Sequence, residues 1–361
     1  MNILHIADFG ITGNFNGVGA AVLNLAKQQK ILGQNAVILS TRPNSSIDIE
    51  SVAVTSSKEF YNTLDNLNPD IVIFHSFYDF IHPRFAKILL QKNIPYLITF
   101  HGGASKDNYK RKHFVKWLVN NLIFKKYIKK AASVIYLNEG EKQNSIFLSL
   151  TKNKSLILPN GIVFPENKHV FNTHSRIIIS FISRLDYQGK GLDVLLLAID
   201  SIAEKLRAQN VQFRFYGYHY NDGTVEKIQN LSPLCEYYGF VQGNEKNRAY
   251  LDTDILILPS RSEGMPMCIL EALSYGIPSI VTPQTNVADI ISANNCGWVT
   301  DLNVDKLAKT ILVAIDDIKS HSTEIRNNCV SISHKYGWDS IAANSILQYQ
   351  KILEGHYNIP N

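Results

Sequence analysis

The chain has 361 residues, of which 45% are hydrophobic and 19% are charged, and its formal net charge is +5. This balance is normal for a globular protein and excludes intrinsic disorder. The length exceeds that of one ordinary domain and fits two domains of roughly 150–180 residues each.

The four cysteines all lie in the second half of the chain and include no CxxC pair. The sequence therefore indicates neither a zinc site nor a disulfide framework, and we expect buried free thiols in a reducing compartment. The first ten residues, MNILHIADFG, lack the basic head and long apolar core of a signal peptide. Because no run of 18 apolar residues occurs either, we expect a cytoplasmic protein.

Short apolar segments alternate with helical segments along the chain, which is typical of an α/β fold with parallel sheets covered by helices on both faces. In the first half the pattern predicts strands at 2–7, 36–40, 71–74, 96–100, 133–137 and 155–158, a helix at 18–32 and a long helical region over about 109–130. In the second half it predicts strands at 176–182, 212–216, 255–258 and 279–282, and helices at 191–206, 267–275 and 338–354.

A polar stretch without periodicity at 167–175 predicts a linker between two domains. We expect Rossmann-like domains at 1–166 and 167–337, followed by a C-terminal helix within 338–361 that packs on its own domain or crosses back to the first. Two such halves hold their ligand at the carboxyl ends of their strands, in the cleft between the domains.

The first strand is followed by the glycine-rich loop DFGITGNFNGVGAA. Gly13, Gly17 and Gly19 would let backbone amides approach an anion, and the helix that begins near Gly17 adds its positive end. The spacing is not GxGxxG, and the second strand ends without the acidic residue of a dehydrogenase. Arg42 at that position leaves an NADP dehydrogenase open as a distant alternative.

Two cations, Arg184 and Lys190, flank the polar loop between the strand at 176–182 and a helix that starts near Gly191. A pair of positive charges in such a loop suits a diphosphate. The alternative is a solvated basic pair, which is disfavoured because cations oppose the dipole at the start of a helix.

The segment SEGMPMCILE follows the strand at 255–258. Glu263 and Gly264 lie in its loop, Pro266 suits the first turn of a helix, and free amides from about Met267 onward can bind an anion. Glu271, about one turn into the helix, can bond a vicinal diol such as a ribose. Its alternative role is a surface residue that stabilises the helix start, although its neighbours are apolar.

The sequence resembles the retaining GT-B glycosyltransferases, in particular the large group typified by the family 4 transferases. The matching pieces occur in the family's order and cover nearly the whole chain: the glycine loop at 13–19, TFHG at 99–102, LPNGI at 158–162, the Arg184 and Lys190 pair, LPSRSEGMP at 258–266, and Glu263 with Glu271 eight positions later. The set is specific because the pieces share one order and spacing.

The resemblance implies a GT-B fold, with an acceptor-binding and a nucleotide-sugar-binding domain facing each other across a cleft. It implies that Arg184 and Lys190 neutralise the donor diphosphate, that Glu271 holds the ribose hydroxyls, and that Glu263 and His101 face the donor sugar. The backbone at Gly17 and at Gly264, Met265, Pro266 and Met267 would cradle phosphate and sugar. No metal and no cofactor is implied, since the nucleotide-sugar is a substrate.

The implied reaction moves a hexosyl or N-acetylhexosaminyl group, with retained configuration, from a nucleotide donor to a hydroxyl of a saccharide or lipid-linked saccharide in surface glycan synthesis. UDP is the favoured base. One departure is the aromatic segment 216–220, where relatives carry a glycine-rich turn, so base contacts are not carried over from it. We expect 239–241 to border the base instead.

The acidic motif Asp252-Thr253-Asp254 resembles the metal-binding DxD of the other major transferase fold. It precedes the strand at 255–258 and so falls at the wrong end of the sheet, and Arg184, Lys190 and the helix ends already supply positive charge. Two alternatives to the transferase remain, a GT-B sugar-nucleotide 2-epimerase and a non-catalytic partner of an active transferase.

The segment 106–130 holds nine Lys or Arg residues and one acidic residue, Asp107. Aromatic and aliphatic residues alternate with these charges: Phe114, Trp117, Leu118, Leu122, Phe124 and Tyr127. This composition is typical of a surface that binds anionic lipid, which would make the protein peripheral on the inner face of the plasma membrane. The alternatives are a solvated helix face with core aromatics and a nucleic-acid surface, and nothing else supports the latter.

Overall fold

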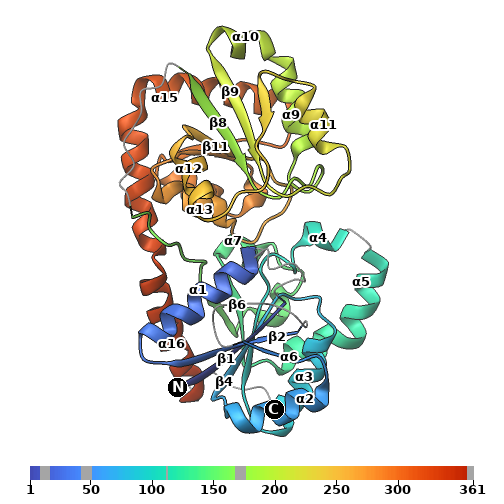
Figure 1. Ribbon diagram of the computed structural model, residues 1–361. Helices are drawn as coiled ribbons and strands as arrows, with labels where there is room; N and C mark the ends of the chain where they lie inside the picture. Colours follow the sequence, from blue (N-terminus) through green and yellow to red (C-terminus); the bar gives the residue numbers. More distant parts are fainter. Residues whose placement is uncertain (9–16, 42–50, 111–112, 167–175, 356–361) are drawn as a thin grey trace. The chain divides into compact units, whose positions relative to one another are not determined.

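The computed structural model describes residues 1–8, 17–41, 51–110, 113–166 and 176–355 (Figure 1). The predicted linker at 167–175 lies outside these ranges, as do Gly13 and Arg42. The chain divides into two compact units, one formed by Met1–Gly161 with Trp338–Asn361 and the other by Ile162–Gly337. Each unit is described by itself.

The division falls at 161/162, whereas the sequence predicts it at 166/167. Ile162 already belongs to the second unit, because its N–H donates to the Tyr336 carbonyl at 2.7 Å and it bridges to Gly337. Gly161 packs on Trp338 so closely that a Cβ there would lie 2.4 Å from the indole ring. The helix that begins at Trp338 is part of the N-terminal unit.

The N-terminal unit is built on a seven-stranded parallel sheet in the order β3-β2-β1-β4-β5-β6-β7. Its strands are β1 (Asn2–Ala7), β2 (Asn35–Ser40), β3 (Ser51–Ala53), β4 (Ile71–His75), β5 (Tyr96–Thr99), β6 (Ser133–Tyr136) and β7 (Ser155–Ile157). Its helices are α1 (Gly17–Ile31), α2 (Ser57–Leu67), α3 (Ile81–Gln91), α4 (Lys106–Lys110), α5 (His113–Val119), the π-helix η1 (Asn120–Phe124), α6 (Lys125–Lys130), α7 (Glu139–Gln143), α8 (Leu148–Thr151) and α16 (Trp338–Leu353). The strand order reverses between β1 and β4, which is where α/β sheets bind their ligands.

Side chains of this sheet alternate between two apolar cores, as the two-residue period of a strand requires. In β1, Leu4 and Ile6 belong to the core beneath α2 and α3, whereas Ile3 and Ala7 belong to the core that includes residues of α1 and α16. Figure 1 shows α1 and α16 together on one side of the sheet. His5, between Leu4 and Ile6, therefore faces α1 and α16.

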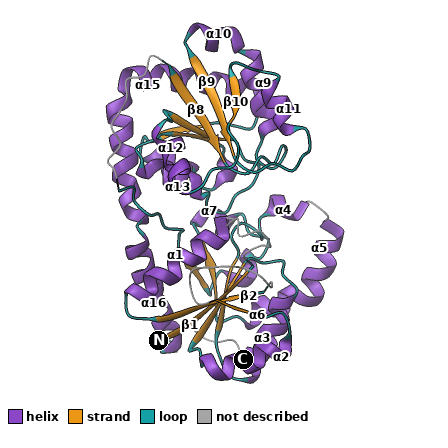
Figure 2. Cartoon of the chain, viewed as in Figure 1, coloured by secondary structure: helices purple, strands orange, loops and turns teal. Residues whose placement is uncertain are grey.

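The C-terminal unit repeats this plan with a six-stranded parallel sheet in the order β10-β9-β8-β11-β12-β13 (Figure 2). Its strands are β8 (Ile177–Ile182), β9 (Val211–Tyr216), β10 (Cys235–Tyr237), β11 (Ile255–Leu258), β12 (Ser279–Val281) and β13 (Gly297–Val299). Its helices are α9 (Leu192–Ser201), α10 (Ala203–Ala208), α11 (Thr224–Gln229), α12 (Gly243–Leu251), α13 (Met267–Ser274), η2 (Pro283–Thr285), α14 (Ala288–Ala293), α15 (Val304–Ser333) and η3 (His334–Tyr336). The order reverses between β8 and β11, so the loops after these two strands are neighbours.

Two predicted helices are interrupted. The helix predicted at 191–206 breaks at Ile202, whose φ of −121° and ψ of 17° separate α9 from α10. The region predicted at 109–130 contains α5, a π-turn at 120–124 and α6. The wider π-turn keeps Asn120 and Phe124 buried, although the residues just before them are largely exposed.

No helix in the described ranges is both long enough and apolar enough to cross a membrane.

Candidate active site

The loop between β8 and α9 carries both predicted cations, Arg184 and Lys190. Asp186 closes a turn in this loop, because its Oδ1 accepts a hydrogen bond from the Gly189 N–H at 2.9 Å and its carbonyl accepts one from the Lys190 N–H at 3.0 Å. The loop is therefore an ordered turn at the carboxyl end of β8, which limits where Lys190 can point.

The loop after β11 approaches this turn closely. Gly191 has a φ of +72°, and a Cβ there would lie 2.0 Å from the Pro259 carbonyl oxygen, so only glycine fits. Arg261 fastens the two loops: its N–H donates to the Gly189 carbonyl at 3.0 Å, and its guanidinium holds both Asp193 oxygens at 2.7 and 2.8 Å. Sequence reasoning missed this clamp.

Lys190 and Glu263 meet directly where the two loops adjoin. Lys190 Nζ donates to Glu263 Oε1 at 2.5 Å, and each side chain is only 14% exposed. The backbone of Glu263 is fixed as well, since its N–H donates to Gln284 at 3.0 Å and its carbonyl accepts from Asn286 Nδ2 at 2.6 Å. The predicted phosphate cation and the predicted sugar carboxylate thus form one charge-assisted hydrogen bond.

Arg184 is the more exposed cation, with 52% of its side chain accessible. Its Nη2 lies 3.9 Å from Asp186 Oδ2, and its guanidinium carbon lies 5.7 Å from the centre of the Tyr220 ring. A long ion pair at an exposed position contributes little. Arg184 therefore keeps most of its charge available to a ligand.

Helix α13 begins at Met267, and Pro266 is its N-cap, one residue before the first-turn position predicted for it. Gly264, Met265 and Pro266 are buried in the loop before the helix. Its N-cap residue, Pro266, makes no side-chain hydrogen bond to the helix. The amides of its first turn are therefore oriented to meet an anion at the carboxyl end of β11. In the N-terminal unit, α1 begins at Gly17, which is exposed.

Both carboxylate oxygens of Glu271 are hydrogen bonded from α12. Lys246 Nζ donates to Oε1 at 2.7 Å, and the Tyr250 hydroxyl donates to Oε2 at 2.6 Å. Lys246 and Tyr250 are four residues apart and so share one face of α12. They fix the orientation of Glu271, and each of its oxygens keeps a second lone pair for a ligand hydroxyl.

Cys268, in the first turn of α13, lies near the charged side chains of both ion pairs, Lys190 with Glu263 and Lys246 with Glu271. Desolvation raises the pKa of its thiol to about 12, and the charges of Lys190, Glu263, Glu271 and Lys246 also act on it. The two carboxylates and two lysines therefore surround the start of α13. Within these two pairs the charges cancel.

Exposed aromatic rings follow β9, which pairs with β8, and β10, which pairs with β9. Gly217, after β9, has a φ of +147°, and a Cβ there would lie 1.9 Å from the Ser183 carbonyl oxygen. The exposed rings are Tyr218, Tyr220, Tyr238 and Phe240, each 44–53% accessible. They offer flat apolar surfaces at the same edge of the sheet as Arg184.

The acidic motif at 252–254 has structural partners at the opposite end of β11. Asp252 Oδ2 lies 3.4 Å from Arg214 Nη1. Asp254 accepts from the Ile178 N–H at 3.0 Å and from Arg326 Nη2 at 2.9 Å. The bonds of Asp254 tie β11 to β8 and to α15, and Asp252 pairs with Arg214 of β9, so both carboxylates have structural partners. That the reaction needs no metal stays a prediction.

In the N-terminal unit His101 follows β5 with a φ of +48°, a conformation that non-glycine residues rarely adopt. The next residue, Gly102, has a φ of +78° and donates its N–H to Glu141 Oε1 at 2.5 Å. Glu141 Oε2 accepts from the Leu137 N–H at 2.6 Å, and burial raises the pKa of this carboxyl to about 7. Strained backbone held by a buried group is characteristic of functional sites.

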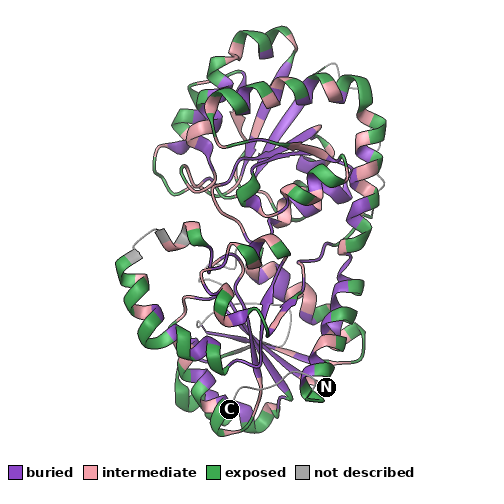
Figure 3. Ribbon diagram, turned by 180° about the vertical axis from the view of Figure 1, so that it is seen from behind, coloured by how far each residue is buried: buried purple, intermediate pink, exposed green. Residues whose placement is uncertain are grey.

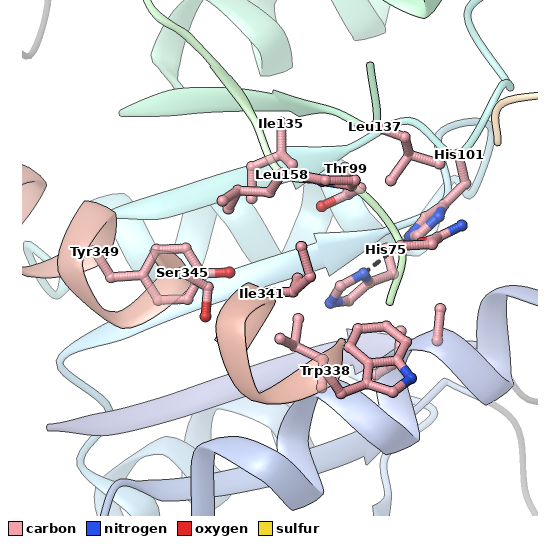
Figure 4. A pocket seen from close by; sticks show the side chains of 15 residues that line it. His75, Thr99, His101, Ile135, Leu137, Leu158, Trp338, Ile341, Ser345 and Tyr349 are labelled. Carbon is pink, nitrogen blue, oxygen red and sulfur yellow. Dashed lines mark hydrogen bonds between the residues drawn. The ribbon is translucent and has the colours of Figure 1, made fainter. Parts of the chain in front are cut away.

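His101 is one end of a buried row of hydrogen-bonded side chains, which we call the histidine chain: His101, His75, His5, Gln29 and Ser345. The successive contacts are His101 Nε2 to His75 Nδ1 at 3.1 Å, His75 Nε2 to His5 Nδ1 at 2.9 Å, His5 Nε2 to Gln29 Oε1 at 2.8 Å and Gln29 Nε2 to Ser345 Oγ at 2.9 Å. His75, His101 and Ser345 line a cavity of about 30 Å³ (Figure 4). That volume holds about one water molecule.

Acid should destabilise the N-terminal unit. Burial lowers the pKa of His5, His82 and His101 to about 4 and holds that of His75 well below 6.5. Because the unfolded imidazoles titrate at 6.5, this stability is complete above pH 6.5 and is lost as the pH falls toward 4. Glu141 has the opposite effect on stability, because its pKa is higher in the folded than in the unfolded state. It is one group against four histidines, so the histidines dominate.

We therefore expect the free energy of unfolding of the N-terminal unit to be lower at pH 5.0 than at pH 7.5, by an amount on the order of several kcal/mol at about 1.4 kcal/mol per pKa unit, and its urea midpoint to fall accordingly. Unfolding followed by circular dichroism at both pH values measures it. Equal midpoints would show that the imidazoles are not buried as neutral rings.

Sequence reasoning identified residues that the structure brings together in the C-terminal unit, namely Lys190, Glu263, Glu271 and the start of α13. It missed Lys246 and Tyr250, although their i, i+4 spacing was a usable signal. It also missed the histidine chain, whose five members come from five separate segments and carry no local motif.

Comparison with known proteins matches a family model to each unit. The model for glycosyltransferase family 4 matches residues 15–163, and the model for glycosyl transferases group 1 matches residues 176–317. An uncharacterized glycosyltransferase of Methanocaldococcus jannaschii is 25% identical over 293 residues, which are 72% of this chain and 70% of that protein. A protein of Salmonella typhimurium named as a colanic acid biosynthesis glycosyltransferase is 27% identical over 155 residues, 38% of this chain and 37% of that protein.

Solved structures with the same fold include sucrose-phosphate synthase from Thermosynechococcus elongatus, with a TM-score of 0.77, 15% identity and coverage of 98% of this chain and 99% of that one. The Anabaena protein HepE, solved in complex with UDP and glucose, has a TM-score of 0.73, 15% identity and coverage of 97% and 99%. With both units matched, the chain belongs to the family 4 type of glycosyltransferases and has the GT-B fold.

Proposed function

We propose that the C-terminal unit binds the diphosphate of a UDP-sugar and that the enzyme transfers the sugar with retained configuration to a hydroxyl of a saccharide or lipid-linked saccharide. The observation that carries this proposal is the direct contact of Lys190 with Glu263 beside the start of α13. A cation held at the carboxyl ends of β8 and β11 is positioned for phosphate, and its partner carboxylate for a sugar.

Leaving-group stabilisation is the main catalytic effect in this proposal. The bond between the anomeric carbon and the diphosphate oxygen breaks as negative charge develops on the diphosphate, and Arg184, Lys190 and the amides of α13 meet that charge. The acceptor hydroxyl forms the new bond on the same face, and its proton passes to a departing phosphate oxygen. These groups supply the charge that a metal would otherwise provide, so we propose a metal-independent reaction.

The nucleoside contacts follow from the neighbouring groups. Glu271, oriented by Lys246 and Tyr250, accepts hydrogen bonds from the two ribose hydroxyls. Phe240, an exposed ring within the region 239–241 predicted to border the base, provides a stacking surface for it. UDP is favoured because HepE, of the same fold, was solved with UDP and glucose.

His101 is proposed to contact the donor sugar, and the colanic acid relative supports a role in polysaccharide synthesis. A reaction screen tests the whole proposal. Purified enzyme would be incubated with UDP-, GDP- and ADP-sugars, each with simple sugar acceptors, and release of nucleoside diphosphate and the anomeric configuration would be read by NMR. We expect UDP release with a retained α or β configuration. Inversion, or no turnover of any donor, would contradict the proposal.

The 2-epimerase alternative predicts a different product. With UDP-N-acetylglucosamine alone, an epimerase would accumulate the 2-epimer, whereas a transferase yields free sugar and UDP slowly through hydrolysis. The two products have distinct anomeric proton signals. A non-catalytic partner would give neither.

We further propose that α5 and η1 bind an anionic membrane surface. Phe114, Trp117, Leu118 and Leu122 are 44–69% exposed, whereas Phe124 and Tyr127 of the same segment are core residues. Figure 3 shows α5 as a largely exposed helix of the N-terminal unit. Lys125, Lys126, Lys129 and Lys130 are also exposed. Large exposed apolar side chains beside lysines match an anionic lipid surface.

Vesicle sedimentation tests this surface. The protein should bind vesicles of phosphatidylglycerol more tightly than vesicles of phosphatidylcholine, and Leu122→Ala should weaken that binding about 10-fold, as expected for one lost apolar anchor. Leu347→Ala is the matched control, because Leu347 is also an exposed leucine, 49% accessible, but lies on α16. Equal losses in both variants, or no preference for the anionic lipid, would contradict membrane docking through this segment.

A further inference from the structure

The histidine chain runs through the core of the N-terminal unit from the end of β5 to α16. His5 and Gln29 are 0% exposed and Ser345 is 1% exposed. Burial keeps the pKa of His5 and His101 near 4, so these rings are neutral at physiological pH. A neutral imidazole has one N–H donor and one acceptor nitrogen, and every contact of the chain must therefore pair a donor with an acceptor.

Ser345 sets the direction of these bonds. Its hydroxyl donates to the Ala342 carbonyl, one turn earlier in α16, at 2.7 Å. A hydroxyl has a single hydrogen, so Ser345 Oγ must accept from its other neighbour. That neighbour is Gln29, whose NH₂ group therefore faces Ser345 and whose carbonyl oxygen faces His5.

The donor and acceptor roles of Gln29 then determine which nitrogen carries the proton in each of the three imidazole rings. The Gln29 oxygen accepts, so His5 carries its proton on Nε2 and accepts at Nδ1. His75 consequently donates from Nε2 and accepts at Nδ1. His101 in turn donates from Nε2, which leaves its Nδ1 without a proton. Within the described part of the chain, this Nδ1 has no hydrogen-bond partner.

We infer that Ser345 of α16 holds His101 in the Nε2–H tautomer and so presents Nδ1 as a hydrogen-bond acceptor at the carboxyl end of the N-terminal sheet. That this acceptor receives a hydroxyl of the donor sugar rests on the proposed function. Ser345, Gln29, His5 and His75 are then positioning residues for His101. Reversal of the chain would turn every donor into an acceptor and would cost the bond from Ser345 to Ala342.

Nitrogen-15 spectra of histidine-labelled enzyme distinguish the two tautomers without any substrate. His101 should show an unprotonated Nδ1 in the unsubstituted enzyme, its signals being assigned by their loss in His101→Gln. Ser345→Ala should lower the ratio of Nε2–H to Nδ1–H by about 3- to 10-fold, the effect of one hydrogen bond. Ser345→Thr, which keeps the hydroxyl, should restore the ratio.

Ser333→Ala is the matched control. Ser333 is 1% exposed and donates to the carbonyl of Val330, three residues earlier, at 2.7 Å, as Ser345 does to Ala342, but it lies in α15. This variant should leave the His101 spectrum unchanged. An unchanged His101 spectrum in folded Ser345→Ala, or a protonated Nδ1 in the unsubstituted enzyme, would overturn the inference.

A stronger substitution, Gln29→Lys, places a donor-only group against His5 and should reverse the chain. In the folded variant we expect His101 to carry its proton on Nδ1, kcat/KM for the donor to fall about 10-fold, and the affinity for free UDP, which lacks the sugar, to stay the same. If the enzyme turns over no nucleotide-sugar at all, the proposed function fails while the spectra still decide the tautomer.

Discussion

Lys190→Ala is expected to lower kcat for sugar transfer by about 10²- to 10³-fold, the usual effect of removing one preorganised donor to developing negative charge. Lys190 is only 14% exposed and is held at 2.5 Å from Glu263. Its removal takes a cation from the proposed diphosphate site. It also leaves the Glu263 carboxylate without that partner, where it repels the anionic donor. Release of nucleoside diphosphate under steady-state conditions measures the effect.

Two companion variants separate these causes. Lys190→Ala with Glu263→Gln removes both charges and should recover donor binding more than turnover. Lys306→Ala breaks an ion pair with Asp301 in the same unit, but there the side chains are 65% and 60% exposed, so turnover should be unchanged. Near-normal kcat in folded Lys190→Ala would contradict the assignment of the diphosphate site to this loop. Near-normal kcat in folded Arg184→Ala would contradict it as well.

Glu271→Ala is expected to lower kcat/KM for the donor by about 10²-fold, because hydrogen bonds to a charged acceptor are worth about 1.5–3 kcal/mol each. The same change frees Lys246 and leaves the buried Tyr250 hydroxyl only the more distant Cys268 carbonyl, at 3.4 Å, as an acceptor. A general loss of stability must therefore be separated from the loss of a ribose contact.

Nucleoside diphosphates with and without the 2′-hydroxyl make that separation. The unsubstituted enzyme should bind UDP more tightly than 2′-deoxy-UDP, and Glu271→Ala should bind the two equally. Tyr250→Phe, which removes the donor to Glu271 but keeps the carboxylate, should reduce this preference only in part. If Glu271→Ala still discriminates between the two nucleotides as the unsubstituted enzyme does, Glu271 does not hold the ribose.

The strand ends of the C-terminal unit could be predicted from sequence because their signals are local. β11 was predicted with its observed bounds, and the predicted loop residues Glu263 and Gly264 lie only a few positions after its end. Glycines such as Gly191 mark a close approach whose cause, the Pro259 carbonyl, lies in another loop. Short-range patterns thus located Lys190, Glu263 and Glu271 correctly at one edge of the sheet.

The remaining features depend on contacts that no short pattern records. Gln29 and Ser345 are 316 residues apart in the chain and become neighbours only because α16 packs beside α1. The division of 109–130 into exposed α5 and buried Phe124 depends on a π-turn, which alternation of charge and apolar residues does not reveal.

Calorimetric titration of UDP and UMP, with GDP and ADP in parallel, tests the central claim most directly, because it isolates the second phosphate from the rest of the donor. We predict that UDP binds at least about 10-fold more tightly than UMP, as expected for one charge-assisted contact, and that Arg184→Ala with Lys190→Ala removes most of this difference. Equal affinities for the mono- and diphosphate, or a difference that survives in the double variant, would contradict a diphosphate site at Arg184 and Lys190.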